Sequence, residues 1–389
     1  MTWTIKSFEK YRLMAPGPVA LHPEVICELS ASMVHHRTPL FDQVLKSTLQ
    51  KLRLVFQTQE PVYIVNGTGS TGMEVALVNV LSPGDELLCV VSGKFGERWR
   101  DMAQVFGYNV HSLDVSWGQA VDPAQVLEVL KQQPQIKAVL CQVCETSTAV
   151  LHPIKELVHT IKNHNPQILF LVDAITAAGT LDLPMNDWKL DAVVAGSQKA
   201  FMLPTGLSFV SFSRMAQEQF SKAQTPRYAL DIRLEKKANE KGETYFSSSV
   251  TLIRALDKAL DIMLEKGLPH WFSQIHKKAE WTRQMGSQLN LPLYSQSPSP
   301  SLTAFRIPEK IDGQKLREHM ESHYHVTVMG GQDSLKGKIL RVGHMGYILK
   351  EDLLALAGAL YLSLKDFGYS ELPPEEKFYS FCESTLKDI

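Results

Sequence analysis

Short apolar runs alternate with amphipathic stretches between residues 60 and 212, and this alternation constrains the fold more than any other feature of the sequence. The apolar runs are continuous, as is typical of strands that are covered on both faces. Strands that alternate with helices in this way predict an α/β fold with a mostly parallel, doubly wound sheet. We expect strands at 62–65, 86–91, 110–115, 136–141, 168–172, 192–195 and 207–212, with helices at 71–81, 95–106, 123–132 and 154–163.

The remaining sequence predicts a second, smaller domain. Residues 213–250 are polar and charged, so we expect them to cross the surface or a subunit interface. A helical repeat of apolar residues follows and ends at Gly267, a typical stop residue. Beyond it we expect an α+β pattern, with strands near 302–307, 326–328 and 339–342 and helices near 314–322 and from 351. The chain therefore divides into an N-terminal arm (1–13), a large domain (14–267) and a small C-terminal domain (268–389).

Charge and targeting signals narrow the choice of partner and compartment. The chain of 389 residues has 40 lysines and arginines and 41 aspartates and glutamates, a net charge of −1. This balance argues against a nucleic acid or a membrane surface as the main partner. The N-terminus lacks the pattern of a signal peptide, and no apolar run reaches the length of a membrane helix. The five scattered cysteines fit a reducing compartment, so we expect a cytoplasmic protein.

Cys141 and Cys144 form a single C-x-x-C motif inside an apolar run. Residues three apart on a strand face opposite sides, and no second pair completes a zinc site. Free cysteines behave as small apolar residues, so we expect two core thiols and no metal site.

A glycine-rich segment, GTGSTG at 67–72, follows an expected strand and opens an expected helix. It matches the G-x-G-x-x-G pattern of dinucleotide sites, which requires an acidic residue at the end of the next strand. That strand ends at Val91 and Ser92, without an acid. Two interpretations stay open at this point. The segment is either a phosphate site at a helix N-terminus or a tight turn that needs glycine.

Two polar residues follow two of the expected strands. Asp173 comes after the strand at 168–172, where open α/β sheets bind ligands, although a helix cap is an alternative. Lys199 follows the strand at 192–195, and desolvation there would make it a nucleophile, although a solvated loop lysine is an alternative. A phosphate loop, an acid and a lysine together are what pyridoxal phosphate requires.

With these motifs the chain resembles class V aminotransferases, within fold type I of the pyridoxal-phosphate enzymes. It is most similar to the alanine–glyoxylate and serine–pyruvate aminotransferase group. The resemblance extends from MAPGP at 14–18 to RVGHMG at 341–346. Its most specific motifs are GSQKA around Lys199, Asp173 after its strand, and ETST at 145–148.

The resemblance implies a role for each matching residue. Lys199 would form the internal aldimine and move a proton between the substrate α-carbon and the cofactor. Asp173 would hold the proton on the pyridine nitrogen, and Arg341 would clamp the substrate α-carboxylate with two parallel bonds. Further cofactor contacts are implied for Thr68, Gly69, Ser70 and Gln198 at the phosphate, Phe95 stacked on the ring and Thr146 beside it. Tyr245 and Ser248 match positions that reach the phosphate from the other subunit, which implies a homodimer with shared sites.

Without the resemblance, Phe95 would be interpreted as a core residue and Arg341 as part of a surface ion pair. We expect a ping-pong transaminase that moves an amino group from alanine or serine to glyoxylate or pyruvate. The alternatives are a desulfurase or lyase of the same class, a nicotinamide-dependent dehydrogenase and a protein without enzymatic activity. A desulfurase would have histidine before the lysine and a loop cysteine, whereas Gln198 precedes Lys199 here and residues 283–340 contain no cysteine. The cluster His35, His36 and Arg37 is assigned no role, because a substrate contact, an interface and a solvated loop all fit it.

Overall fold

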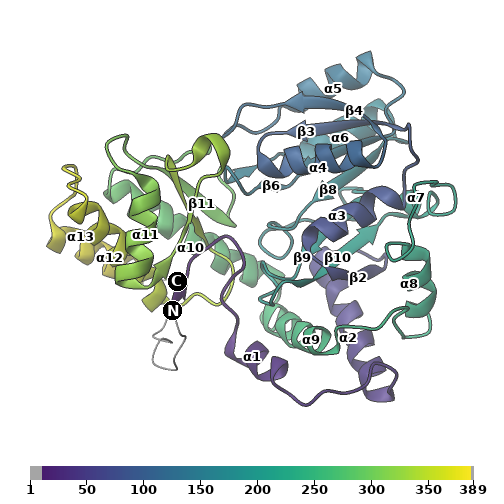
Figure 1. Ribbon diagram of the computed structural model, residues 1–389, viewed down its shortest axis with the longest axis horizontal. Helices are drawn as coiled ribbons and strands as arrows, with labels where there is room; N and C mark the ends of the chain where they lie inside the picture. The colour runs from purple at the N-terminus through teal and green to yellow at the C-terminus, as the bar shows by residue number, and fades with distance from the viewer. Residues whose placement is uncertain (1–10, 387–389) are drawn as a thin grey trace.

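The computed structural model describes residues 11–386, and Figure 1 shows them folded into two lobes. The larger lobe carries the central sheet, and the smaller lobe holds the C-terminal part of the chain, drawn in green and yellow. Most of the N-terminal arm expected at 1–13 lies outside the described residues. The domain boundary expected after Gly267 stays a prediction, and α10 (Leu268–Gln288) begins directly after it.

The central sheet has the strand order β2-β10-β9-β8-β5-β3-β4 within the described residues. Strands β9, β8, β5, β3 and β4 pair in parallel, whereas β10 pairs antiparallel with both β9 and β2. β2 therefore runs in the same direction as the parallel strands, and the predicted mostly parallel α/β sheet is confirmed. The strands are β2 (Val62–Gly67), β3 (Glu86–Val91), β4 (Asn109–Asp114), β5 (Ala138–Gln142), β8 (Leu169–Asp173), β9 (Ala192–Gly196) and β10 (Gly206–Phe212).

Helices cover both faces of this sheet, which explains why its inner strands are mostly apolar, whereas the edge strand β4 is polar and partly exposed. One face packs against α3 and α4, and the other against α2, α5, α6 and α9. Within β5, Ala138 and Leu140 join the first of these cores, while Val139 and Cys141 join the second. The helices that cover the sheet are α2 (Pro39–Phe56), α3 (Gly69–Val78), α4 (Lys94–Val105), α5 (Pro123–Gln132), α6 (Ile154–His164) and α9 (Val250–Leu264). They are preceded by α1 (Pro23–Leu29).

The polar segment at 213–250 runs along the outside of the large lobe and also forms two short helices (Figure 1). α7 (Arg214–Gln217) and α8 (Ile232–Asn239) each begin at a side-chain cap, supplied by Ser213 and Asp231. Each helix buries a single apolar side chain. Hydrophobic periodicity is therefore too weak in this segment to reveal its helices.

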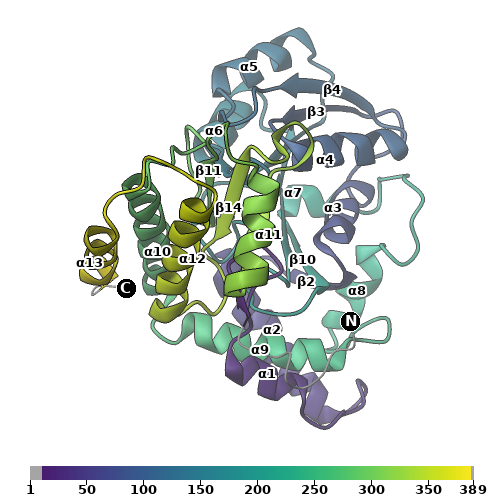
Figure 2. The ribbon, with the colours of Figure 1, turned by 60° about the vertical axis from the view of Figure 1, so that its left-hand side comes forward.

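The small lobe has the predicted α+β arrangement, and Figure 2 shows its helices beside β11 and β14. Its sheet has the order β11-β14-β13, and its core contains Trp281, Phe305 and Leu356. Strand β1 (Arg12–Leu13) pairs with β12, which joins the start of the described chain to this lobe. Its other elements are β11 (Leu302–Arg306), α11 (Gly313–Tyr324), β12 (Val326–Thr327), β13 (Met329–Gly330), a 3-10 turn (Asp333–Leu335), β14 (Ile339–Gly343), α12 (Lys350–Asp366) and α13 (Glu375–Thr385).

The C-x-x-C cysteines are core thiols, as predicted. Cys141 and Cys144 are buried and free, and burial raises the pKa of Cys144 to about 12. Among residues 11–386, no three His, Cys, Asp or Glu side chains gather closely enough to hold a metal ion. No helix in the same range combines the length and apolar character needed to cross a membrane.

A buried carboxylate fixes the end of the sheet away from the site. Asp191 directly precedes β9 and is 2% exposed. Its carboxylate accepts the Phe170 N–H at 2.8 Å, the Ser213 hydroxyl at 2.7 Å and the Lys162 ammonium at 2.6 Å. These bonds join β8, β9 and the segment after β10. Removing the carboxylate would leave the Lys162 charge and the backbone N–H without this partner.

We expect Asp191→Ala to lower the free energy of unfolding by about 3–5 kcal/mol, the range for breaking a buried ion pair. Asp187→Ala, at an exposed position in the turn that precedes β9, is the matched control and should change this free energy by less than about 0.5 kcal/mol. Urea titration of both variants, followed by circular dichroism, measures the difference. Equal unfolding midpoints for the two variants would contradict the role assigned to Asp191.

Candidate active site

Five segments that follow strands of the central sheet meet at one edge. Strands β2, β9, β8, β5 and β3 run in the same direction, so their carboxyl ends lie together. Open α/β sheets bind ligands at this edge. A cavity of about 260 Å³ lies there, and it is lined by Thr68, Gly69, Ser70, Phe95, Arg98, Thr146, Asp173, Ile175, Thr176, Gln198 and Lys199. Most of the candidate residues from the sequence therefore surround one space.

Lys199 lies in the turn after β9, with its amine buried against the N-terminal segment. Nζ donates a hydrogen bond to the Pro16 carbonyl oxygen at 2.6 Å, and the residue is 9% exposed. Burial, together with the nearby charge of Arg341, lowers the pKa of Lys199 to about 8. A substantial share of the amine is therefore neutral close to physiological pH, as a nucleophile requires.

Gly17 leaves the space that the Lys199 amine occupies. Its φ angle of +134° is one that residues with a side chain rarely adopt. A Cβ atom at this position would lie 2.3 Å from Lys199 Nζ, far inside van der Waals contact. Backbone conformation and the lysine therefore both require glycine here.

Asp173 is the last residue of β8 and borders the same cavity. Its Oδ1 accepts the Ile175 N–H at 2.9 Å, so the carboxylate also makes the local bond that a cap would make. The residue is 5% exposed, and burial raises the pKa of Asp173 to about 7. A buried carboxyl with a strongly raised pKa beside a cavity is typical of a functional site.

The loop after β2 leads into the N-terminus of α3, where unpaired backbone N–H groups suit an anion. Gly67 has φ +145°, and a Cβ atom there would lie 2.4 Å from Thr71 Oγ1. The same Thr71 oxygen accepts the Thr68 N–H at 3.2 Å, which closes the turn. The structure therefore shows the tight turn that needs glycine. The phosphate site stays a prediction, for a helix start whose first residues line the cavity.

Gln198 shows that the cavity has bonding capacity left for a ligand. Its Oε1 is buried and has no hydrogen-bond partner among the described residues. A buried polar atom without a partner is rare in a native protein and is costly unless a ligand or water satisfies it. An unpaired acceptor here calls for a ligand or water that donates, and the lysine, the acid and the helix N-terminus around the same cavity fit pyridoxal phosphate.

Glu145 fixes the start of α4, which carries Phe95. Its carboxylate accepts the N–H groups of Phe95 at 3.1 Å and Gly96 at 3.0 Å, and the Ser147 hydroxyl at 2.5 Å. Gly93 allows this approach, because a Cβ atom there would lie 2.6 Å from Glu145 Cδ. The position of the Phe95 backbone is thus set by an acid at a helix N-terminus, where negative charge is stabilised.

Arg341, on β14, reaches the site from the small lobe. Its Nε donates to the Gly330 carbonyl and its Nη1 to the Thr146 carbonyl, both at 2.9 Å. Only 6% of the residue is exposed, so the interpretation as a surface ion pair is wrong. Burial lowers the pKa of Arg341 to about 10, and its guanidinium is held beside Thr146, which lines the cavity.

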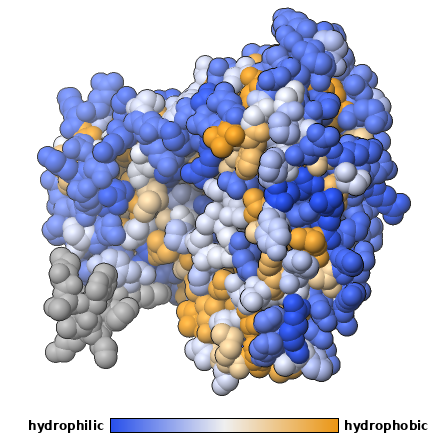
Figure 3. Space-filling view, turned by 45° about the vertical axis from the view of Figure 1, so that its right-hand side comes forward, coloured by the Kyte–Doolittle hydropathy of each residue, from blue (hydrophilic) through white to orange (hydrophobic). Residues whose placement is uncertain are grey.

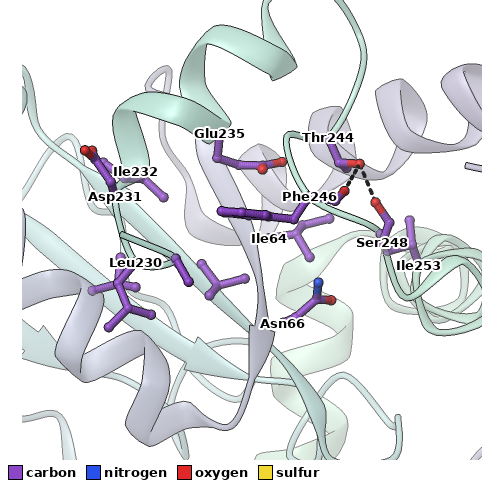
Figure 4. Close-up of a pocket in the computed structure, with 13 residues that line it drawn as sticks. Ile64, Asn66, Leu230, Asp231, Ile232, Glu235, Thr244, Phe246, Ser248 and Ile253 are labelled. Atoms are coloured by element: carbon purple, nitrogen blue, oxygen red, sulfur yellow. Dashed lines mark hydrogen bonds between the residues drawn. The ribbon is translucent and has the colours of Figure 1, made fainter. Parts of the chain in front are cut away.

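Three candidate residues are not among those that line this cavity. Arg341 is joined to the lining only through its bond to the Thr146 carbonyl. Tyr245 is 43% exposed, and Ser248 lines a separate cavity of about 190 Å³ near α8 (Figure 4). Within the described chain neither residue is brought into the lining of the Lys199 cavity. Their expected contact with the phosphate of the other subunit stays a prediction.

Three residues at the site were given no role by the sequence analysis. Arg98 donates to Ser70 Oγ at 3.3 Å, and its guanidinium lies 4.8 Å from the centre of the Phe95 ring. Its spacing of three residues from Phe95 on one helix was a usable signal, because such residues share a face. Glu145 belongs to a recognised motif, but its bonds are visible only in the structure. Pro16 acts through a backbone carbonyl, which leaves no signal in the sequence.

A buried lysine, a buried acid and a helix N-terminus around one cavity of an α/β fold fit pyridoxal phosphate. Comparisons with known proteins identify the family. The model of the family described as aminotransferase class-V matches residues 27–356. The chain therefore belongs to the class V aminotransferases, which use pyridoxal phosphate, and it falls in the alanine–glyoxylate and serine–pyruvate aminotransferase group, as predicted.

Three similar proteins illustrate the family. A protein of Anabaena cylindrica named soluble hydrogenase 42 kDa subunit is 36% identical over 93% of this chain and 95% of its own. The L-aspartate–glyoxylate aminotransferase of Paracoccus denitrificans is 32% identical over 89% of this chain and 88% of its own. The solved structure of an alanine–glyoxylate aminotransferase from Nostoc sp. has a TM-score of 0.88 at 27% identity, covering 94% of this chain and 98% of that one.

The raised pKa of Asp173 means that its ionised carboxylate destabilises the cofactor-free fold. We expect Asp173→Asn to raise the free energy of unfolding of the cofactor-free protein by roughly 2–4 kcal/mol at pH 8. The gain should shrink below pH 7, where folded Asp173 takes up a proton, and vanish toward pH 4, where the unfolded chain does so too. Urea titrations across this pH range measure it, and a gain that does not depend on pH would contradict the assignment.

Proposed function

We propose that this aminotransferase moves the amino group of alanine or serine to glyoxylate or pyruvate by a ping-pong mechanism, with Lys199 and Asp173 as its catalytic residues. One observation carries the proposal. The buried amine, the buried carboxyl and the helix N-terminus border a single cavity at the carboxyl edge of the sheet. The buried guanidinium of Arg341 is bonded to the backbone carbonyl of Thr146, which belongs to the cavity lining.

The cavity residues divide into groups that would hold the different parts of pyridoxal phosphate. Thr68, Gly69, Ser70 and Gln198 would hold the phosphate, Phe95 would stack on the ring, and Thr146 would lie beside it. Bound pyridoxal phosphate supplies an aldehyde that takes up the amino group and a ring that withdraws electrons. Asp173 would hold a proton on the ring nitrogen, and that positive partner would keep the carboxylate ionised.

Lys199 is proposed to carry the proton. Its amine has a pKa near the working pH, so it can take a proton from the substrate α-carbon and return it to the cofactor side. The Pro16 carbonyl holds Nζ from one side, and Gly17 prevents a steric conflict. These two backbone contacts restrict the amine to a small volume, which reduces the entropy lost when it transfers the proton.

Arg341 is proposed to bind the α-carboxylate of the donor. Its bonds to the Gly330 and Thr146 carbonyls set the plane of the guanidinium, as two-point carboxylate binding requires. The guanidinium in the cavity lining itself, that of Arg98, is bonded to Ser70 on the phosphate side. The second carboxylate of a dicarboxylic donor would therefore compete with the cofactor phosphate for Arg98. This competition favours donors with a single carboxylate, such as alanine and serine.

Other reactions fit the site less well. A desulfurase of this class would have a histidine in place of Gln198 and a cysteine within 283–340. A dehydrogenase would need an acid after β3, where Ser92 stands. A protein that had lost its activity would not be expected to keep Lys199, Asp173 and Arg341 together at one buried site. Lyase activity is the remaining alternative, and measurements of activity distinguish it from transamination.

The proposal includes a homodimer, in which Tyr245 and Ser248 reach the phosphate of the partner subunit. Large apolar side chains are exposed on and beside α1 and α2, at Ile26, Met33 and Leu40. Figure 3 shows apolar residues gathered at the foot of the large lobe, where these helices lie. Contact with a second copy would cover such a surface. The five free thiols fit the cytoplasm, and the partners proposed are small amino and 2-oxo acids rather than nucleic acid or membrane.

The donor preference is tested by single-turnover reactions of the cofactor-loaded protein with a panel of amino acids, followed by glyoxylate or pyruvate. Alanine or serine should convert the cofactor fastest, because they need only one carboxylate clamp. A profile led by aspartate, or by a phosphorylated donor, would contradict the proposed substrates. Release of sulfide or ammonia without amino transfer would contradict transamination itself.

Replacement of the carboxylate clamp gives a separate prediction. Arg341→Lys should raise the KM for alanine about tenfold or more and change kcat less, because lysine offers a point charge in place of two parallel donors. Arg306→Lys, a change on the neighbouring strand β11 at an exposed position, is the matched control and should leave both constants unchanged. Steady-state kinetics with glyoxylate measure the two variants. An unchanged KM in Arg341→Lys would remove this residue from substrate binding.

A further inference from the structure

A short segment without regular structure, Glu243–Ser249, lies beside the cavity shown in Figure 4 and carries Tyr245. We call it the strap. Arg37, at the N-terminal approach to α2, binds the strap from outside. Its Nη1 donates to the Thr244 carbonyl at 2.7 Å and its Nη2 to the Tyr245 carbonyl at 3.4 Å. Nη1 also lies 3.4 Å from the Glu243 carboxylate.

Other bonds hold the strap from the inside of the lobe. Glu235, on α8, accepts the Tyr245 N–H at 3.0 Å. Asn66, at the end of β2, donates to the Ser247 carbonyl at 3.1 Å. Figure 4 shows the ring of Phe246 reaching into the cavity below Glu235. Both sides of the Tyr245 peptide unit are thus bonded, the N–H to Glu235 and the carbonyl to Arg37.

These anchors use the backbone of Tyr245 and not its side chain. The residue is 43% exposed, and its ring meets Phe246 edge-on with the ring centres 4.8 Å apart. A fixed backbone that presents an exposed aromatic side chain is suited to contact with a second molecule, because little conformational freedom is left to lose on binding. The anchors therefore define the position of Tyr245 relative to the rest of its own chain.

We propose that Arg37 is a positioning residue that acts in trans, fixing the strap so that Tyr245 meets the cofactor phosphate of the partner subunit. This inference rests on the proposed function and deepens it, because it gives the unassigned His35-His36-Arg37 cluster a role. Arg37 is not a freely solvated loop residue, since its guanidinium bonds to three successive residues of the strap. Planar geometry lets one arginine serve two carbonyls, which the single ammonium of lysine cannot reproduce.

The position of Arg37 on its own element supports this role. Its N–H donates to His35 Nδ1 at 3.2 Å, and the neighbouring Thr38 caps α2. The His35 and His36 rings stack with their centres 4.5 Å apart. Arg37 is therefore attached to the start of an 18-residue helix, and α2 packs against α9, which begins directly after the strap.

The first test compares two ligands that differ only in the phosphate. Arg37→Ala should weaken binding of pyridoxal phosphate to the cofactor-free dimer by about tenfold, the effect of losing one charge-assisted bond. Binding of pyridoxal, which has no phosphate, should not change. The affinity of Arg37→Lys for pyridoxal phosphate should fall between those of Arg37→Ala and the wild type. Arg53 is an exposed arginine on α2, and the affinity of Arg53→Ala should equal that of the wild type. Quenching of protein fluorescence measures affinity, and sedimentation confirms the dimer.

Equal losses for both ligands, or no loss for either, would overturn the proposal. So would a loss in Arg37→Ala that is fully restored by Arg37→Lys, because a point charge alone would then explain the effect.

Hybrid dimers separate action in trans from action in cis. In a hybrid of an Arg37→Ala subunit with a Lys199→Ala subunit, the only Lys199 belongs to the Arg37→Ala subunit. If the strap acts in trans, this site is completed by the intact strap of the other subunit. Borohydride should then trap pyridoxal phosphate there with wild-type affinity. In a hybrid of a wild-type subunit with an Arg37→Ala/Lys199→Ala subunit, the wild-type subunit carries the only Lys199 and its partner carries the altered strap. Trapping at this site should need about tenfold more cofactor. The opposite pattern would show action in cis and overturn the inference. Failure of the wild type to trap any cofactor would instead overturn the proposed function.

Discussion

The common direction of the strands is the constraint on which the site depends. Because β2, β9, β8, β5 and β3 point the same way, the loops after them meet at one edge even though they are far apart in sequence. That edge receives the start of α3, the acid of β8 and the lysine after β9. The small lobe and the N-terminal segment complete the site, since Arg341 and the Pro16 carbonyl both reach it from outside the sheet.

Burial of charged groups gives the site its chemistry and also a cost in stability. Burial lowers the pKa of Lys199 and raises that of Asp173, so both titrate near the working pH. Each ionised group is expensive in an apolar environment unless a partner satisfies it. A bound cofactor would supply a positive ring nitrogen for the acid and an aldehyde for the amine. The buried groups that the reaction requires thus lower the stability of the cofactor-free fold, as is common at active sites.

The sequence predicted the sheet well because most of its strands are buried on both faces. It predicted less where packing gives no periodic pattern. Asp173 directly follows a continuous apolar run, and Lys199 follows another after three residues. Their position at a ligand-binding edge could therefore be inferred from the sequence. The short helices α7 and α8 bury too few apolar residues to be predicted from hydrophobic periodicity in the sequence. Pro16 and Glu145 act through bonds between distant segments, and only the structure shows such bonds.

The most direct test of the account is to load the protein with pyridoxal phosphate, reduce it with borohydride and map the modified peptide by mass spectrometry. The account predicts a pyridoxyl group on the peptide that contains Lys199, at about one per chain, and its loss in Lys199→Arg. Stable binding of the cofactor without a label at Lys199, or with the label on another lysine, would contradict the central claim that the buried amine after β9 is the catalytic residue.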